Sequence, residues 1–205
     1  MQQEHATIGG DMGKNRLEAF SDGVIAIIIT IMVLELRAPA AGSWTALSPL
    51  LPLFLSYVLS FVYLGIYWNN HHHMLHAGSH VNGAIIWANL HLLFWLSLFP
   101  AGTAWMDETH FEPVPVGVYC IFLLMAAVAY WILQQLIIRA QGPQSLLSRA
   151  VGRDWKGKVS PFLYLLGIGL SVRWPHAALG IYALVALFWL VPDRRIERAL
   201  HAGAD

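Results

Sequence analysis

The chain has 205 residues and no formal net charge, because 12 lysines and arginines balance 12 aspartates and glutamates. Hydrophobic residues make up 57% of it and charged residues 12%, whereas soluble domains have about 45–50% apolar and about 25% charged residues. This composition excludes a disordered chain and argues against a water-soluble globule. Zero net charge also argues against a nucleic-acid partner, which would require a basic surface. We therefore expect an integral membrane protein.

Six segments are apolar enough to be membrane-spanning helices, which need about 20 mainly apolar residues. We predict one all-α membrane domain over residues 1–205. Its helices are expected at about residues 17–36, 48–68, 81–99, 115–138, 159–173 and 175–191. Ser48 and Ser160 each precede a proline, a pattern typical of a helix start, and Pro100 and Gly102 supply a stop signal.

Lysines and arginines are distributed unequally between the two sides of this topology. Two of them, Arg37 and Arg173, lie on one side. The other side carries the remaining ten: Lys14, Arg16, Arg139, Arg149, Arg153, Lys156, Lys158, Arg194, Arg195 and Arg198. Because basic loops stay in the cytoplasm, we expect cytoplasmic N- and C-termini and an even number of spans. The acidic loop with Asp107, Glu108 and Glu112 then faces outward, as a solvated turn or as a vestibule that concentrates cations.

An acidic residue lies close to the start of the first apolar segment. Asp22 follows Phe20 and Ser21 there, and an acid at the membrane boundary is costly unless it is paired or faces water or the bundle interior. Its candidate partners are Arg16 and the histidines after the second segment. Alternatively, these residues form an interfacial helix start in which the carboxylate satisfies free N–H groups. The residues leave both interpretations open.

Five histidines lie within ten residues at the end of the second segment: His71, His72, His73, His76 and His80. His71 or His72 is the expected hydrogen-bond and charge partner of the Phe-Ser-Asp region, where it would also respond to cytoplasmic pH. The spacing of His72, His76 and His80 would align three imidazoles for a metal. Gly78 and Ser79 are expected to interrupt that helix, so a metalloenzyme is the less favoured interpretation.

Beyond Asp22, the first segment carries an apolar stripe. Ile27, Thr30 or Ile31, and Leu34 share one helix face. In a monomer this stripe would contact core or lipid, whereas in a ring of copies it would form apolar rings that gate a pore by dewetting. The sequence has no TVGYG-like filter, phosphate-binding loop or GxSxG element. We therefore expect conduction or transport, not an enzyme, with no cofactor and no resident metal.

These residues resemble the transmembrane protein 175 family of potassium channels. The resemblance rests on Arg16-xxx-Phe20-Ser21-Asp22-Gly23 before an isoleucine-rich helix, on Trp68-Asn-Asn-His-His, and on Trp95-Leu-Ser-Leu-Phe-Pro100. It covers about residues 14–105. It implies a potassium-preferring cation channel in a bacterial inner membrane, formed by a homotetramer of six-helix chains.

The resemblance also implies roles for individual residues. The first helix of each chain would line a pore that lacks the usual filter loop, surrounded by membrane lipids. Ile27 and Leu34 would be hydrophobic constrictions, and Thr30 would form a hydroxyl ring that replaces part of the hydration of the permeant K⁺. The polar network that holds this helix would contain Arg16, Phe20, Ser21, Asp22, His71 and His72. A proton-coupled transporter that uses Asp22 and His71 or His72 is the alternative.

Overall fold

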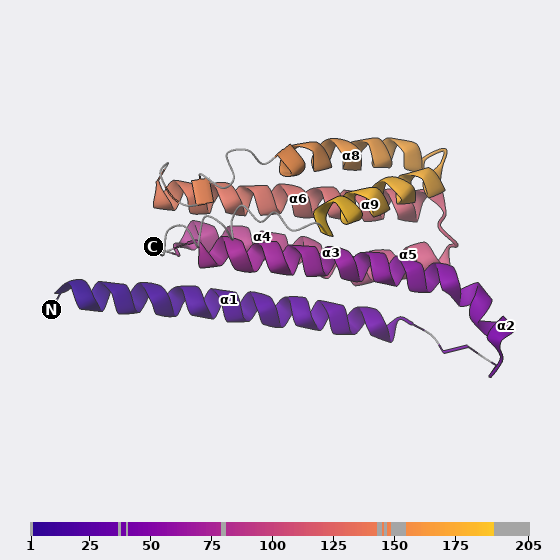
Figure 1. Ribbon diagram of the computed structural model, residues 1–205, viewed down its shortest axis with the longest axis horizontal. Helices are drawn as coiled ribbons and strands as arrows, with labels where there is room; N and C mark the ends of the chain where they lie inside the picture. Colours follow the sequence, from indigo (N-terminus) through magenta and orange to yellow (C-terminus); the bar gives the residue numbers. More distant parts are fainter. Residues whose placement is uncertain are drawn as a thin grey trace.

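The computed structural model is a bundle of helices that run alternately up and down (Figure 1). It describes residues 2–36, 38–39, 41–78, 81–142, 145, 147–148 and 155–190, with the backbone alone for residues 2–12. These residues contain no strand. The helices are α1 (Gln2–Leu34), α2 (Trp44–Leu47), η1 (Ser48–Leu50), α3 (Leu51–His76), α4 (Gly83–Ser97), α5 (Phe99–Glu108), α6 (Pro113–Gln141), α8 (Trp155–Ser171) and α9 (Pro175–Leu190).

Within the described part of the chain, four helical stretches are long and apolar enough to cross a membrane: Gly13–Leu34, Trp44–His76, Gly83–Glu108 and Pro113–Gln141. The helices α8 and α9 have 17 and 16 residues. At 1.5 Å per residue they extend about 26 and 24 Å, somewhat less than the roughly 30 Å of a hydrocarbon core. The expected all-α membrane fold is confirmed, while a count of six spans stays a prediction.

Three helix ends differ from those expected. The helix α1 begins at Gln2, well before residue 17, because a helix need not end where its apolar part ends. The helix α3 continues past Trp68 to His76, since no glycine or proline follows before Gly78. Pro100 does not stop the third segment. It lies in the first turn of α5, where its missing N–H has no helical partner to lose, so the helical path continues.

The two expected serine starts lie inside helical stretches. Helical residues precede Ser48 from Trp44 onward. The helix α8 begins at Trp155 and contains Pro161 in its interior. The Ser160 hydroxyl donates to the Lys156 carbonyl (2.9 Å), so it bonds within the preceding helical turn and caps nothing.

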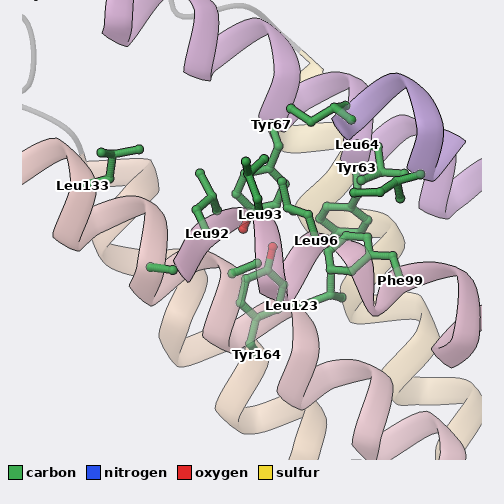
Figure 2. Packing of buried hydrophobic residues seen from close by; sticks show 14 of the residues in the cluster. Tyr63, Leu64, Tyr67, Leu92, Leu93, Leu96, Phe99, Leu123, Leu133 and Tyr164 are labelled. Carbon is green, nitrogen blue, oxygen red and sulfur yellow. The ribbon is translucent and has the colours of Figure 1, made fainter. Parts of the chain in front are cut away.

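The helix α6 lies at the centre of the bundle. It packs against α4 and α5 and also against α8 and α9. Its buried apolar residues recur every three or four positions, as the face of a helix does: Val116, Cys120, Leu123, Ala126, Ala129, Leu133 and Ile137. Figure 2 shows how Leu123 meets Leu96 and Phe99 in this core. The helix α1 lies at one edge of the bundle and α8 at the opposite edge (Figure 1).

Buried hydroxyl groups connect the central helices. Ser60 of α3 lies 2.8 Å from the Thr103 hydroxyl of α5 and 2.7 Å from the Tyr119 hydroxyl of α6. The Tyr63 hydroxyl donates to the Tyr182 carbonyl of α9 (2.7 Å). These bonds satisfy polar groups in an interior that offers no solvent, and so they fix the relative positions of four helices.

The packing of α8 on α9 depends on Gly167. A Cβ atom at Gly167 would lie 2.5 Å from a ring carbon of Tyr182, whereas one at Gly169 would meet nothing within 4 Å.

We expect Gly167→Ala to lower the thermal midpoint of the purified protein by about 3–10 °C, because the buried Tyr182 ring has no room to move away. Gly169→Ala is the control, with an unchanged or slightly higher midpoint, since alanine favours helix. Equal midpoints in a circular dichroism melt would contradict this packing.

Candidate functional site

The helix α1 has a buried face and an exposed face. Its buried residues follow helical spacing and face α3, α4 and α5: Leu17, Ser21, Ile25, Ile28 and Met32. The residues predicted to line a pore are on the face that turns away from the bundle. Ile27 is 59% exposed and Leu34 is 79% exposed, and Thr30 between them is exposed as well. An apolar stripe of this kind requires lipid or another protein surface to cover it.

A groove of about 400 Å³ runs along this side of α1. Ile27, Ile28 and Ile31 form its wall on α1. Pro100 and Ala101 form the wall on α5. The groove is open to the outside of the bundle, and its lining is mainly apolar. It can therefore accept hydrocarbon or the apolar face of another helix.

Three fully buried polar side chains connect α1 to α4 and α3. The Asn89 amide donates to the Ser21 hydroxyl oxygen (2.9 Å) and accepts from Nε2 of His71 (2.7 Å). The Ser21 hydroxyl in turn donates to the Leu17 carbonyl (2.8 Å). Because Asn89 accepts from Nε2, the lone pair of the neutral His71 ring is on Nδ1, which has no hydrogen-bond partner among the described residues. The directional bonds set the rotation of α1 against both neighbours.

A second set of contacts between α1 and α3 lies nearer to the solvent. The Trp68 indole donates to the Asp22 carboxylate (3.0 Å), and Nδ1 of His72 lies 2.7 Å from the Glu18 carboxylate. The partner of Asp22 is therefore an indole N–H. Arg16 is exposed and makes no hydrogen bond or ion pair with the described residues. Phe20 is also exposed, on the side of the apolar stripe.

The histidines at the end of α3 form a stack. The rings of His72 and His76 lie 5.9 Å apart at 17°, and the Trp68 ring stacks on His72 at 6.4 Å. His80, the third member of the predicted metal-ligand pattern, lies outside the described residues. Over the described part of the chain, no three His, Cys, Asp or Glu side chains lie close enough together to hold a metal ion.

Asn89 is the functional candidate that sequence reasoning missed. Its signal is an amide within the otherwise apolar helix α4, because such a residue usually faces the interior of a membrane bundle. A polar residue within an apolar helix does not always bond to a neighbouring helix, however. His91 in the same helix accepts a hydrogen bond from the Trp95 indole of its own helix (2.9 Å), and it has no hydrogen bond to another element among the described residues.

Comparison with known proteins places these features in a family. Residues 16–100 match the family described as "Endosomal/lysosomal potassium channel TMEM175". The chain is 56% identical over 189 residues to a protein of Chryseobacterium sp. (strain P1-3) named a potassium channel, covering 92% of this chain and 98% of that protein. A potassium channel of Streptomyces collinus (strain DSM 40733 / Tue 365) is 30% identical over 185 residues, or 85% of this chain and 90% of the relative.

A solved structure extends the likeness to most of the bundle. The crystal structure of a lysosomal potassium-selective channel TMEM175 homolog from Chamaesiphon minutus superposes with a TM-score of 0.73 at 25% identity. The superposition covers 89% of this chain and 98% of that one. The resemblance inferred from the Phe-Ser-Asp element is confirmed, and the chain belongs to the transmembrane protein 175 family of potassium channels.

Proposed function

We propose that the chain forms a potassium-preferring cation channel, as a homotetramer of six-span subunits with four copies of α1 around a central pore. The observation that carries the proposal is the exposed stripe of Ile27, Thr30 and Leu34, on the face of α1 turned away from its own bundle. The names of the bacterial relatives support potassium as the permeant ion. The open groove beside Ile27 and Ile31 can bind part of the neighbouring subunit.

The polarity of Thr30 favours a pore over simple lipid contact. Its hydroxyl hydrogen is donated to the Ile27 carbonyl of the same helix (2.8 Å). The hydroxyl oxygen therefore presents its lone pairs outward, where four copies would form a ring of acceptors. Such a ring can replace part of the hydration shell of a cation. One layer of hydroxyl groups replaces fewer waters than stacked carbonyl rings, so the preference for potassium should be modest.

Ile27 and Leu34 would act as the gate. They lie three residues before and four residues after Thr30, which corresponds to about 4.5 and 6 Å along the helix axis. Four copies of each would place apolar rings on both sides of the hydroxyl ring, without any filter loop. Narrow apolar rings exclude water and ions until the helices tilt or rotate apart. The buried Ser21–Asn89–His71 bonds hold α1 in the rotation that points the stripe toward the axis.

Charges at the two ends of the stripe suit a cation path. Glu35 is exposed directly after Leu34, and Glu18 and Asp22 are partly exposed before Ile27. Carboxylates at both mouths would raise the local concentration of cations. Proton-coupled transport is less favoured, because the bacterial relatives are named channels and His71 is fully buried.

The orientation follows from where the basic residues lie along the alternating helices. The helix α6 ends, with Arg139 in its last turn, at the end of the bundle from which α1, which carries Lys14 and Arg16, starts (Figure 1). The helix α8, with Lys156 and Lys158 in its first turn, starts part-way along α6 and runs away from that end. The acidic residues between α5 and α6 are at the other end. We therefore place the basic end in the cytoplasm of a bacterial cell, with α8 and α9 as the fifth and sixth spans. Arg173, counted on the opposite side, lies between α8 and α9. The remaining six counted cations, Arg37, Arg149, Arg153, Arg194, Arg195 and Arg198, lie outside the described residues.

The gate can be tested by making it polar. Ile27→Asn should raise passive potassium flux into liposomes about tenfold or more, because a wettable ring lowers the barrier by about 1.4 kcal/mol or more. Ile121→Asn is the control, since Ile121 is also exposed but lies on α6. A flux that is unchanged in Ile27→Asn, or raised equally in both variants, would refute the gate.

The hydroxyl ring can be tested by an isosteric change. Thr30→Val keeps the shape of the side chain and removes the oxygen, so potassium and sodium permeability should become nearly equal while current persists. The reversal potential under potassium/sodium bi-ionic conditions measures this ratio. Thr109→Val, outside the stripe, should leave it unchanged. Flux that a pH gradient drives uphill would instead indicate a proton-coupled transporter.

The buried network can be tested at its central residue. Asn89→Leu leaves Ser21 and His71 without their shared partner, at a cost of about 1–3 kcal/mol. We expect a lower thermal midpoint and an altered potassium flux. His91→Leu is the matched control in the same helix, because it removes only a bond to Trp95. Equal stability and flux in the two variants would show that the network does not position α1.

A further inference from the structure

A cavity of about 120 Å³ lies between α3, α6, α8 and α9, and no residue of α1 lines it. It is therefore separate from the pore stripe. Its volume is close to that of an engineered cavity of about 150 Å³ that holds benzene. It can accept one ring or the first part of a hydrocarbon chain.

Aromatic rings form the apolar part of the cavity. Tyr63 and Tyr67 come from α3, Tyr130 from α6, Tyr164 from α8 and Trp189 from α9. Figure 2 shows Tyr67 and Tyr164 with their hydroxyl oxygens directed toward each other. A wall of rings with hydroxyl groups is suited to an amphiphilic ligand, because it contacts hydrocarbon and also offers hydrogen bonds.

A buried amide also lines this cavity. Gln134 of α6 is 5% exposed, and its side chain makes no hydrogen bond with the described residues. Among the described residues, only His71 Nδ1 is a fully buried polar side-chain atom without a partner, so the Gln134 amide atoms retain access to the cavity, where a ligand or water can bond to them. Its N–H groups are suitable donors to a carbonyl oxygen such as that of a fatty-acyl ester.

One cation lies at the rim. Lys158 of α8 lines the cavity, is exposed, and makes no hydrogen bond or ion pair with the described residues. Lys156, two residues earlier, donates instead to the Phe188 carbonyl (3.1 Å) and lies 4.8 Å from the centre of the Phe188 ring. No described Asp or Glu lines the cavity. The site therefore has a net positive charge and favours an anionic group.

The cavity extends from the depth of lipid ester groups into the hydrocarbon region, because Tyr63 and Ala127, about 20 Å before the ends of α3 and α6, also line it. Gln134 lies seven residues before the end of α6, and Asn70, also in the lining, lies six residues before the end of α3. These separations correspond to about 10 Å along the helices. Trp131, exposed at the same level, and Trp189 are the residue type that gathers at membrane interfaces.

We propose that this cavity binds an anionic phospholipid from the cytoplasmic leaflet. Its phosphate binds Lys158, an ester carbonyl accepts from Gln134, and the first carbons of an acyl chain pack among the tyrosine rings. Basic pockets between membrane helices on the cytoplasmic side commonly hold such headgroups. This site rests on the membrane orientation of the proposed function but not on the pore, so it can be tested without measuring ion conduction.

The test compares phosphatidylglycerol and phosphatidylcholine with identical acyl chains, added to the delipidated full-length protein in detergent. Native mass spectrometry counts bound lipids per subunit, and a thermal melt measures the stabilisation that they provide. We expect phosphatidylglycerol to bind more tightly and to raise the thermal midpoint more. Lys158→Gln should weaken its binding about fivefold, the loss expected for one lysine beside an anionic lipid.

Variants of the protein distinguish lipid binding at this cavity from a general electrostatic attraction between the protein and anionic lipids. Arg139→Gln removes an exposed cation from the end of α6 and should leave binding unchanged, while Lys158→Arg should retain it. Gln134→Leu should leave the delipidated protein folded, because no protein partner is lost, yet reduce the stabilisation by phosphatidylglycerol. Equal losses in Lys158→Gln and Arg139→Gln, or equal binding of the two lipids, would overturn the proposal. Displacement by millimolar glycerol 3-phosphate would also overturn it, since the ligand would then be a soluble phosphate ester.

Discussion

The rotation of α1 about its own axis depends on the hydrogen bonds that link Ser21, Asn89 and His71. All three side chains are fully buried, so water cannot replace a bond that is lost. Rotating α1 would break these bonds and would also remove Ile25 and Ile28 from the core. Together with the packing of these isoleucines, the buried hydrogen bonds therefore determine which residues of α1 pack inside the bundle and which remain outside it.

We propose different functions for two regions of the bundle. At one edge, α1 exposes the apolar stripe that we assign to the conduction path. On the other side of the bundle, α8 and α9 together with α3 and α6 line the cavity with Lys158 that we assign to a lipid. The central helix α6 contacts α8 and α9 but belongs to neither the stripe nor its groove. Under the two proposals, the edge with α1 makes the contacts between copies and the cavity binds lipid.

The sequence predicts the helices of this fold better than the side-chain contacts between them. The apolar segments and the stripe of Ile27 and Leu34 follow from hydropathy and helical spacing, which are local properties. The partners of Ser21 and Asp22 were not predictable, because Asn89 and Trp68 are brought to them by packing between different helices. The ends of α1 and α3 were missed for a related reason. Hydropathy marks where hydrocarbon would begin, while a helix ends where its backbone bonding is interrupted.

The most direct test of the account measures distances between copies of α1 in the assembled protein. Spin labels at Leu34→Cys, in a Cys120→Ala background, should give two distances with a ratio of about 1.4, as in a four-fold ring. Labels at Leu187→Cys on α9 should give longer distances with the same ratio. The absence of a distance, a single distance, or longer distances for residue 34 than for residue 187 would contradict a pore lined by α1.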